Sequence, residues 1–119
     1  MIFVGIDVSK SSLDAAAILE TGEVEQRPFR NDAAGHTQLM AWLTPFPHRS
    51  VTLEATGSYH QRLAAVLSAA GERVSVLNPA QVSYFARSQG RRNKTDRVDA
   101  LMLAAYGKER WPAPSLVSN

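Results

Sequence analysis

Residues 2–7 read Ile-Phe-Val-Gly-Ile-Asp, an apolar run of strand length that ends in a carboxylate. Such a run predicts a central β-strand, at residues 2–6, that is buried on both faces of a sheet. A carboxylate at this point has two interpretations: Asp7 is either a turn residue or a functional residue at the edge of the sheet. The stretch itself leaves both open, and the choice depends on which other residues reach the same edge.

Two further strands are predicted directly after the first, at residues 13–19 and 24–30. Residues 20–23, Glu-Thr-Gly-Glu, are typical of the turn of a β-hairpin. The strand at 24–30 alternates in polarity and contains Pro28, which a sheet tolerates at an edge or a bulge. We therefore expect an antiparallel meander of three strands, with the third strand at an edge.

The remaining chain alternates between predicted helices and predicted strands. Helices are expected at residues 34–43, 59–70, 79–87 and 96–108, and strands at 50–53 and 74–77. This order predicts an α/β fold in which helices cover both faces of a mixed five-stranded sheet whose first three strands are antiparallel. His36, near the start of the first helix, is expected to be a surface residue.

Length and composition narrow the class of protein. A chain of 119 residues is long enough for one domain with a single core. The absence of cysteine excludes disulfides, zinc–thiolate sites and a cysteine nucleophile. No apolar run approaches the roughly 20 residues that span a bilayer, and the N-terminus lacks a secretion signal. We therefore expect a cytoplasmic protein without a membrane partner.

Positive charge is concentrated in the last part of the chain. Residues 1–86 contain six Lys and Arg against eight Asp and Glu, whereas residues 87–119 contain seven against three. A local basic excess is typical of a nucleic-acid contact, although a solvated basic loop has the same composition. If phosphates bind here, the candidate residues are Arg91, Arg92, Lys94 and Arg97.

Two acidic residues follow this basic block at the start of an apolar run. Asp96 and Asp99 are three residues apart, so in a helix that begins at residue 96 they would lie side by side on the first turn. The alternative is structural: Asp96 would be the N-cap and Asp99 the third helical residue, both binding free backbone N–H groups. The functional interpretation requires further acids at the same place.

Asp7 and Glu54 are the acids that strands could bring there. If the first and fourth strands are adjacent and parallel, their carboxyl ends meet at one edge of the sheet, where ligands of α/β proteins bind. Four close carboxylates, Asp7, Glu54, Asp96 and Asp99, would repel one another strongly without a cation. Hard oxygen ligands favour Mg²⁺ or Mn²⁺, and paired ions of this kind support phosphoryl transfer.

Four motifs in this order resemble the DEDD transposases of bacterial insertion sequences, which are related to Piv-type DNA invertases. They are GIDVSK at 5–10, LEATGSYH at 53–60, LNPAQVSYFARSQGRRNKTDRVDA at 77–100 and KERWPAP at 108–114. The resemblance implies a RuvC-like domain of the ribonuclease H-like fold and assigns the four acids to a metal-binding catalytic tetrad. It implies site-specific transposition of DNA, in some members guided by a structured RNA.

The resemblance also implies that this chain is a catalytic domain, at residues 1–110, followed by a tail at 111–119. In the family such a tail leads to a coiled coil and a domain that carries a serine thought to attack DNA, and we expect the full-length protein to be a homo-oligomer. The tail itself has too few apolar residues to pack far. Tyr59 and His60, close after Glu54, are candidates for lining the site.

Three other functions remain open from the sequence. The same fold serves metal-dependent nucleases and Holliday-junction resolvases. A domain without activity of its own could bind RNA or DNA. The run GIDVSK before a hairpin also resembles the first phosphate motif of the actin and sugar-kinase group, but the chain lacks a second Gly-rich phosphate loop.

Overall fold

The computed structural model describes residues 1–90 and 99–117, and in this part of the chain five strands form one mixed sheet. The elements in chain order are β1 (Ile2–Val8), β2 (Ser12–Ile18), β3 (Val24–Arg30), α1 (Ala33–Leu43), β4 (Arg49–Glu54), α2 (Gln61–Ala69), β5 (Val74–Leu77), α3 (Pro79–Ser88) and α4 (Ala100–Arg110). None of the described helices is long and apolar enough to span a bilayer.

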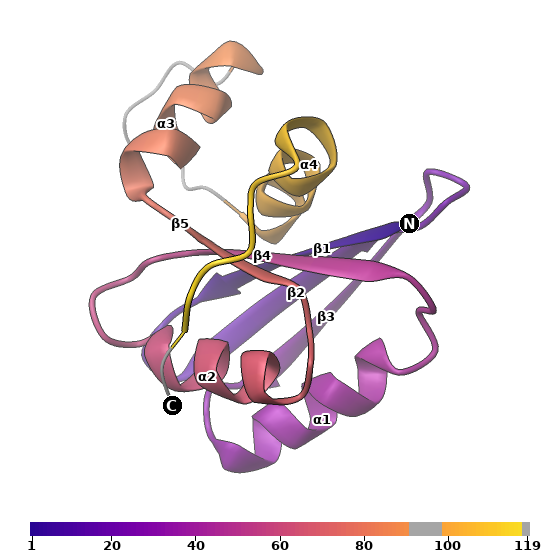
Figure 1. Cartoon of the computed structure of the whole chain (residues 1–119), viewed down its shortest axis with the longest axis vertical. Coiled ribbons are helices and arrows are strands. Elements are labelled where there is room, and N and C mark those ends of the chain that lie inside the picture. The colour runs from indigo at the N-terminus through magenta and orange to yellow at the C-terminus, as the bar shows by residue number, and fades with distance from the viewer. Residues whose placement is uncertain (91–98, 118–119) are drawn as a thin grey trace.

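The strand order is β3-β2-β1-β4-β5, as shown in Figure 1. The first three strands pair antiparallel, and β4 pairs parallel with both β1 and β5. The predicted meander, the edge position of the Pro28 strand and the parallel pairing of the first and fourth strands are therefore confirmed.

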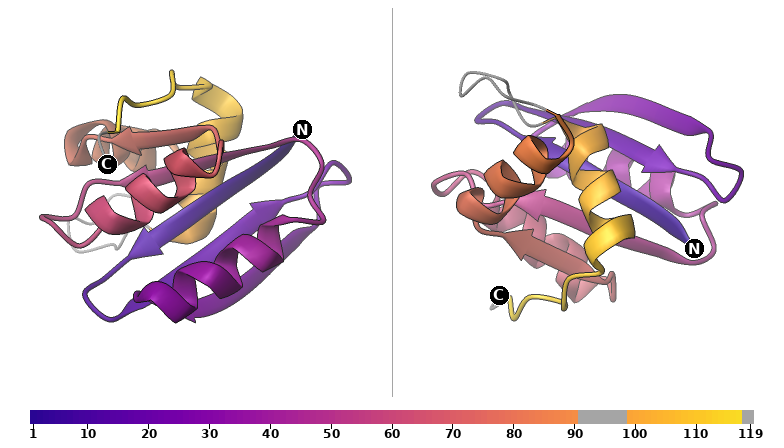
Figure 2. Two further views of the ribbon diagram at one scale, coloured as in Figure 1. Left: turned by 60° about the horizontal axis from the view of Figure 1, so that its bottom comes forward. Right: turned by 90° about the horizontal axis from the view of Figure 1, so that it is seen from above.

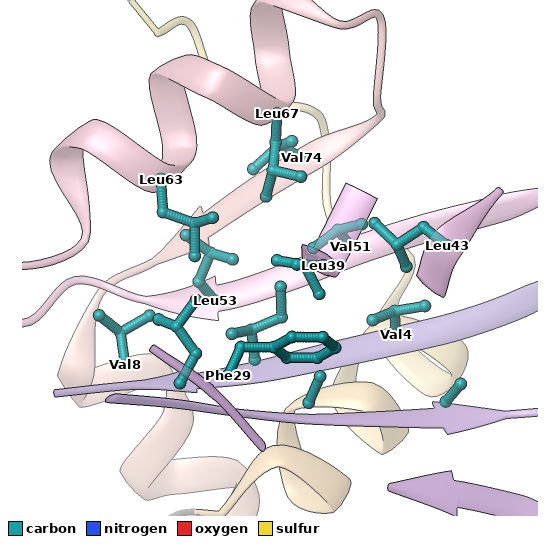
Figure 3. Close-up of a cluster of buried hydrophobic side chains, with 14 of the residues drawn as sticks. Val4, Val8, Phe29, Leu39, Leu43, Val51, Leu53, Leu63, Leu67 and Val74 are labelled. Carbon is teal, nitrogen blue, oxygen red and sulfur yellow. The ribbon is translucent and has the colours of Figure 1, made fainter. Parts of the chain in front are cut away.

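Helices cover both faces of the sheet, α1 and α2 on one side and α3 and α4 on the other (Figures 1 and 2). The side chains of each strand alternate between these faces. The face toward α1 and α2 holds the main apolar core (Figure 3). The strand residues that are fully or almost fully buried in it include Val4, Ile6, Val8, Leu13, Val51 and Leu53.

Helix α4 lies directly on β1 because Gly5 leaves room for it. A Cβ atom at Gly5 would be 2.1 Å from the carbonyl oxygen of Ala100 and 2.3 Å from the backbone nitrogen of Ala104. These are backbone atoms, which cannot rotate away as a side chain would. The close approach holds the first turn of α4 beside β1 at a point two residues before Asp7.

The start of α4 differs from the sequence prediction. The helix begins at Ala100, and Asp99 precedes it as the N-cap, with an extended backbone (φ −99°, ψ 175°). The Oδ1 atom of Asp99 accepts a hydrogen bond from the N–H of Met102 at 2.8 Å. The prediction that Asp99 lies within the first turn is therefore wrong, and the predicted position of Asp96 lies outside the described residues.

His36 is also placed differently, because it is 3% exposed rather than on the surface. Its helix, α1, starts with Asp32 as N-cap, whose Oδ1 accepts from the N–H of Gly35 at 2.8 Å. The end of β3 crosses close to this first turn: a Cβ atom at Gly35 would lie 1.8 Å from the carbonyl oxygen of Arg30. The ring of His36, the next residue, is directed at Asn31, with its Nε2 atom 2.8 Å from the Asn31 Oδ1 atom.

The tail packs further than the sequence predicts. After α4 the chain turns at Trp111 (φ 43°) and runs along the free edge of β5 to lie beside α2 (Figure 1). The N–H of Ser115 donates to the carbonyl of Val74 at 2.8 Å, and the N–H of Val76 donates to the Ser115 hydroxyl at 2.8 Å. Val117 packs against the main core. Hydrogen bonds to a strand edge thus hold a segment that has little apolar surface.

Candidate active site at the carboxyl ends of the strands

The parallel pairing of β1 and β4 brings Asp7 and Glu54 to the same face of the sheet. Gly5 is paired with Thr52, so the residues two positions on, Asp7 and Glu54, lie side by side on the face that α4 covers. Strand β1 continues to Val8, so Asp7 lies within the strand and not just after it. The sheet therefore fixes its backbone more firmly than a turn would.

The charge of Asp7 affects the ionisation of Glu54. Partial burial raises the pKa of the Glu54 carboxyl, and the negative charge of Asp7 raises that pKa further. Both effects disfavour a second negative charge at this edge. A cation bound here would reverse the balance, because it would stabilise both ionised carboxylates.

Asp99 approaches the same region from α4. It lines a groove of about 350 Å³ together with Asp7, Asp14, Ala100 and residues of β3. Its bond to the N–H of Met102 fixes the orientation of the carboxylate. Capping and participation in a site are therefore compatible for this residue, although the sequence presents them as alternatives.

Asp14 is an acidic residue of this groove that sequence reasoning missed. It is the direct partner of Asp7 in the β1–β2 ladder, so both side chains are on the face toward α4. A signal was present in the sequence: a short turn between two antiparallel strands fixes which residues oppose each other. Finding Asp14 required the exact ends of both strands.

The donor chemistry of this edge fits a hard divalent cation. Asp7, Glu54 and Asp99 offer carboxylate oxygens, which Mg²⁺ and Mn²⁺ prefer, and the mutual repulsion of Asp7 and Glu54 favours a positive ion. Within residues 1–90 and 99–117, however, no three His, Cys, Asp or Glu side chains assemble closely enough to hold a metal. The fourth predicted ligand, Asp96, lies outside the described residues.

The predicted phosphate-binding residues Arg91, Arg92, Lys94 and Arg97 also lie outside the described residues. In the described part, Arg27 belongs to the strand that borders the groove. Its guanidinium, however, lies 5.7 Å from the ring centre of Phe29, which is buried on the opposite face of the sheet. Arg27 thus lines the groove, while its guanidinium lies over the ring of Phe29.

Tyr59 and His60 organise the loop after Glu54 but do not line the groove of Asp7 and Asp99. The Nδ1 atom of His60 accepts a hydrogen bond from the N–H of Thr56 at 3.1 Å, which closes this loop. The His60 side chain lies in a different hollow, beside the tail residue Val117. The Tyr59 carbonyl, which accepts from Asn31, and the His60 ring thus shape the loop after Glu54, and their role in the site stays a prediction.

The arrangement of strands and helices is that of RuvC, a member of the ribonuclease H-like fold. A structure of T. thermophilus RuvC in complex with Holliday junction substrate aligns with 98% of this chain and 100% of that chain, with a TM-score of 0.64 and 15% sequence identity. A second Thermus thermophilus RuvC structure aligns over the same shares with a TM-score of 0.65 and 17% identity. The profile of the DEDD (IS110) transposases, described as transposase, matches residues 4–116. The chain belongs to this DEDD transposase family.

Two relatives carry the name pilin gene-inverting protein, one from Moraxella lacunata and one from Moraxella bovis. Each is 34% identical to this chain over 114 residues, which is 92% of the chain. The chain spans 35% of the length of these relatives. The family resemblance inferred from the four motifs is thereby confirmed, as is the RuvC-like fold.

Proposed function

We propose that this chain is the divalent-metal-dependent catalytic domain of a DNA transposase or site-specific recombinase, which cleaves and transfers DNA strands. The observation that carries the proposal is the position of Asp7 and Glu54, adjacent on one face at the carboxyl ends of β1 and β4. The N-terminus of α4 brings Asp99 to the same edge. Family membership supplies the reaction class.

In this proposal Asp7, Glu54, Asp96 and Asp99 hold Mg²⁺ or Mn²⁺. When bound, such ions activate the attacking oxygen and stabilise the leaving oxygen of a phosphodiester. The protein's own contribution is position: the β1–β4 pairing sets the spacing of Asp7 and Glu54, and the N-cap bond orients Asp99. Arg91, Arg92, Lys94 and Arg97 bind the phosphate backbone, so affinity falls as salt rises.

We infer the wider assembly from what the family resemblance implies. Residues 1–110 form the catalytic domain, and the tail at 111–119 leads toward a coiled coil and a serine-bearing domain of the longer protein. The partners are DNA and, as in some members of the family, a guide RNA that binds the same basic block. Transposition requires two DNA ends to be held together, which fits a homo-oligomer that acts where bacterial DNA lies, in the cytoplasm.

Metal binding is the first test, because it requires no DNA target. Millimolar Mn²⁺ should raise the melting temperature of the 119-residue chain, since a ligand at 100 times its Kd adds about 2.7 kcal/mol of stability. Asp7→Asn and Glu54→Gln should remove most of this rise. Glu109→Gln, which removes an exposed carboxylate at the far end of α4, is the control and should keep it. An unchanged melting temperature of the wild-type chain in Mn²⁺ would contradict the proposal.

DNA cleavage is the second test, and it separates this function from a second candidate. The likeness to RuvC favours a nuclease that cuts branched DNA by itself. Both candidates predict Mg²⁺-dependent nicking that Asp7→Asn abolishes. A clear preference for a four-way junction over linear duplex would favour the resolvase, whereas equal cutting, or strand transfer by the longer protein, would favour the transposase. If the chain binds DNA and Mn²⁺ but does not cut DNA, it is a nucleic-acid-binding module without activity of its own.

A further inference from the structure

Asn31, between β3 and α1, connects the two loops that follow the site strands. Its side-chain Nδ2 donates to the carbonyl of Ser9 at 2.9 Å and to the carbonyl of Tyr59 at 3.1 Å. Its backbone N–H donates to the carbonyl of Ser11 at 3.0 Å. Ser9 follows Asp7 by two residues, and Tyr59 lies in the loop after Glu54. One residue therefore holds both loops.

His36 fixes the orientation of this amide. Both Nδ2 partners are carbonyl groups, which can only accept, so the Oδ1 atom of Asn31 must face the Nε2 atom of His36, 2.8 Å away. The Nε2 atom of His36 is thus the donor. The ring is almost fully buried, and its Nδ1 atom has no hydrogen-bond partner among the described residues. A buried ring behind the amide leaves Asn31 little freedom to rotate.

The backbone ladder between the two site strands ends before the carboxylates. The parallel pairs of β1 and β4 run from Ile2 with Arg49 to Ile6 with Leu53. Asp7 and Glu54 lie beyond the last pair, so this ladder alone does not set the distance between their backbones. Asn31 connects the two loops that follow them, at Ser9 and Tyr59, and so restrains that distance.

We propose that Asn31 is a positioning residue that sets the spacing of Asp7 and Glu54 for metal binding, with His36 as its support. This inference rests on the proposed metal site but concerns residues that touch neither the ion nor DNA. Groups that orient metal ligands from behind contribute about 10- to 100-fold to metal affinity. Loss of the Asn31 side chain should have an effect of that order.

The decisive experiment compares Asn31→Ala with a neighbour that loses stability without touching the two loops. Asp32→Ala removes the N-cap bond to Gly35 and the ion pair with Arg30, and so weakens the same end of α1. Calorimetry with Mn²⁺ on the 119-residue chain should show about tenfold weaker binding for Asn31→Ala and less than about a twofold change for Asp32→Ala. Equal losses in both variants would reduce Asn31 to a merely structural role and overturn the proposal.

Asn31→Asp makes the test sharper. The variant keeps the shape and the acceptor for His36, but it presents an oxygen to the carbonyls of Ser9 and Tyr59. The added negative charge should by itself favour a cation, whereas the lost connection should disfavour it. We expect weaker Mn²⁺ binding than in the wild-type chain, and stronger binding would overturn the proposal.

A readout that needs no metal separates this inference from the proposed function. The N–H groups of Ser9 and Tyr59 are hydrogen-bonded within their own loops, to Ser12 and Thr56. In Asn31→Ala both amides should exchange with solvent about tenfold faster, and in Asp32→Ala neither should change. If the wild-type chain binds no Mn²⁺, the metal proposal fails while amide exchange still decides whether Asn31 holds the loops. Unchanged exchange in Asn31→Ala overturns the inference even where Mn²⁺ binds.

Discussion

The two faces of the central strands are built from different kinds of side chain. Toward α1 and α2 the strands present large aliphatic groups that interlock with leucines of both helices (Figure 3). Toward α4 they present mostly small or polar residues, with the apolar pair Phe3 and Ile18 at the end away from the carboxylates. The small and polar members of this set, read from the strand register, include Gly5, Asp7, Asp14, Ala16, Thr52 and Glu54.

This difference separates stability from chemistry within one sheet. Burying an aliphatic side chain contributes roughly 1.5–3 kcal/mol, so the face toward α1 and α2 carries most of the hydrophobic stabilisation. The α4 face gives up part of that contribution. In exchange, the absence of a side chain at Gly5 lets the helix backbone approach closely, and the edge of the face holds carboxylates. We therefore expect substitutions on the face toward α1 and α2 to lower stability, and substitutions on the α4 face to lower metal affinity as well.

The largest loss of stability should follow Leu39→Ala, on the helix α1 that fills the aliphatic face. Leu39 is fully buried, and truncation of such a leucine costs about 2–5 kcal/mol. Urea unfolding should report this loss, while the Mn²⁺ affinity of the folded fraction should stay near the wild-type value. Leu116→Ala makes the same change at a fully exposed position and should cost almost nothing. A Leu39→Ala variant that also loses metal affinity would contradict the separation of the two faces.

The next largest effect is expected for Gly5→Ala, on the α4 face. The new methyl group would overlap backbone atoms of Ala100 and Ala104, and overpacking of this kind costs about 1–3 kcal/mol. Because α4 carries Asp99, its displacement should also weaken Mn²⁺ binding. Glu109→Ala on the same helix is the control: Glu109 is exposed and alanine favours the helix, so stability and Mn²⁺ affinity should stay near the wild-type values. If Gly5→Ala keeps its metal affinity, α4 does not position the site.

A smaller loss of stability is expected at Asp99, where two variants separate helix capping from metal binding. Asp99→Ala loses the N-cap bond to Met102 and should cost about 0.5–2 kcal/mol of stability. Asp99→Asn keeps a good capping residue but loses the charge, so its metal-free melting temperature should stay close to that of the wild-type chain. Both variants should lose part of the stabilisation by Mn²⁺. A full Mn²⁺ response in Asp99→Asn would remove this residue from the proposed ligands.

The sequence predicted those features that depend on local pattern. The apolar run before Asp7 indicated a buried central strand, and Pro28 indicated an edge, because both follow from what a strand can contain. Asp14 was missed because its position opposite Asp7 depends on the register of a hairpin. Asn31 and His36 were missed because their partners are 22, 28 and 5 residues away, in contacts that exist only after the sheet and α1 have packed.

The start of α4 shows a different limit of prediction from the sequence. An aspartate before an apolar helix is compatible with several cap positions, and sequence placed the helix start at residue 96 rather than at Ala100. Asp96 and Asp99 are both suitable N-cap residues by type, and the cap of α4 is Asp99. The contact between Gly5 and the first turn of α4 sets where this helix lies against β1, and that contact cannot be read from the local sequence.

The smallest predicted effect concerns pH and the buried His36. Burial lowers the pKa of His36, and the charge of Arg62 lowers it further, whereas the nearby charge of Asp32 acts in the opposite direction. In the unfolded chain the imidazole has its usual pKa of about 6.5. Between the lowered folded value and about 6.5, the unfolded state therefore binds more protons than the folded state. Stability should rise with pH through this window and become level above it.

His36→Gln isolates this contribution, because glutamine can donate to Asn31 and does not titrate. The free energy of unfolding in urea should be measured for both chains between pH 5 and 8. Since His48 and His60 are present in both, their effects cancel in the difference between wild type and variant. That difference should be constant above about pH 7. As the pH falls below the unfolded pKa, the wild-type chain should lose stability relative to the variant. Parallel curves over the whole range would mean that His36 has the same proton affinity in the folded and unfolded chain, which would contradict the lowered pKa.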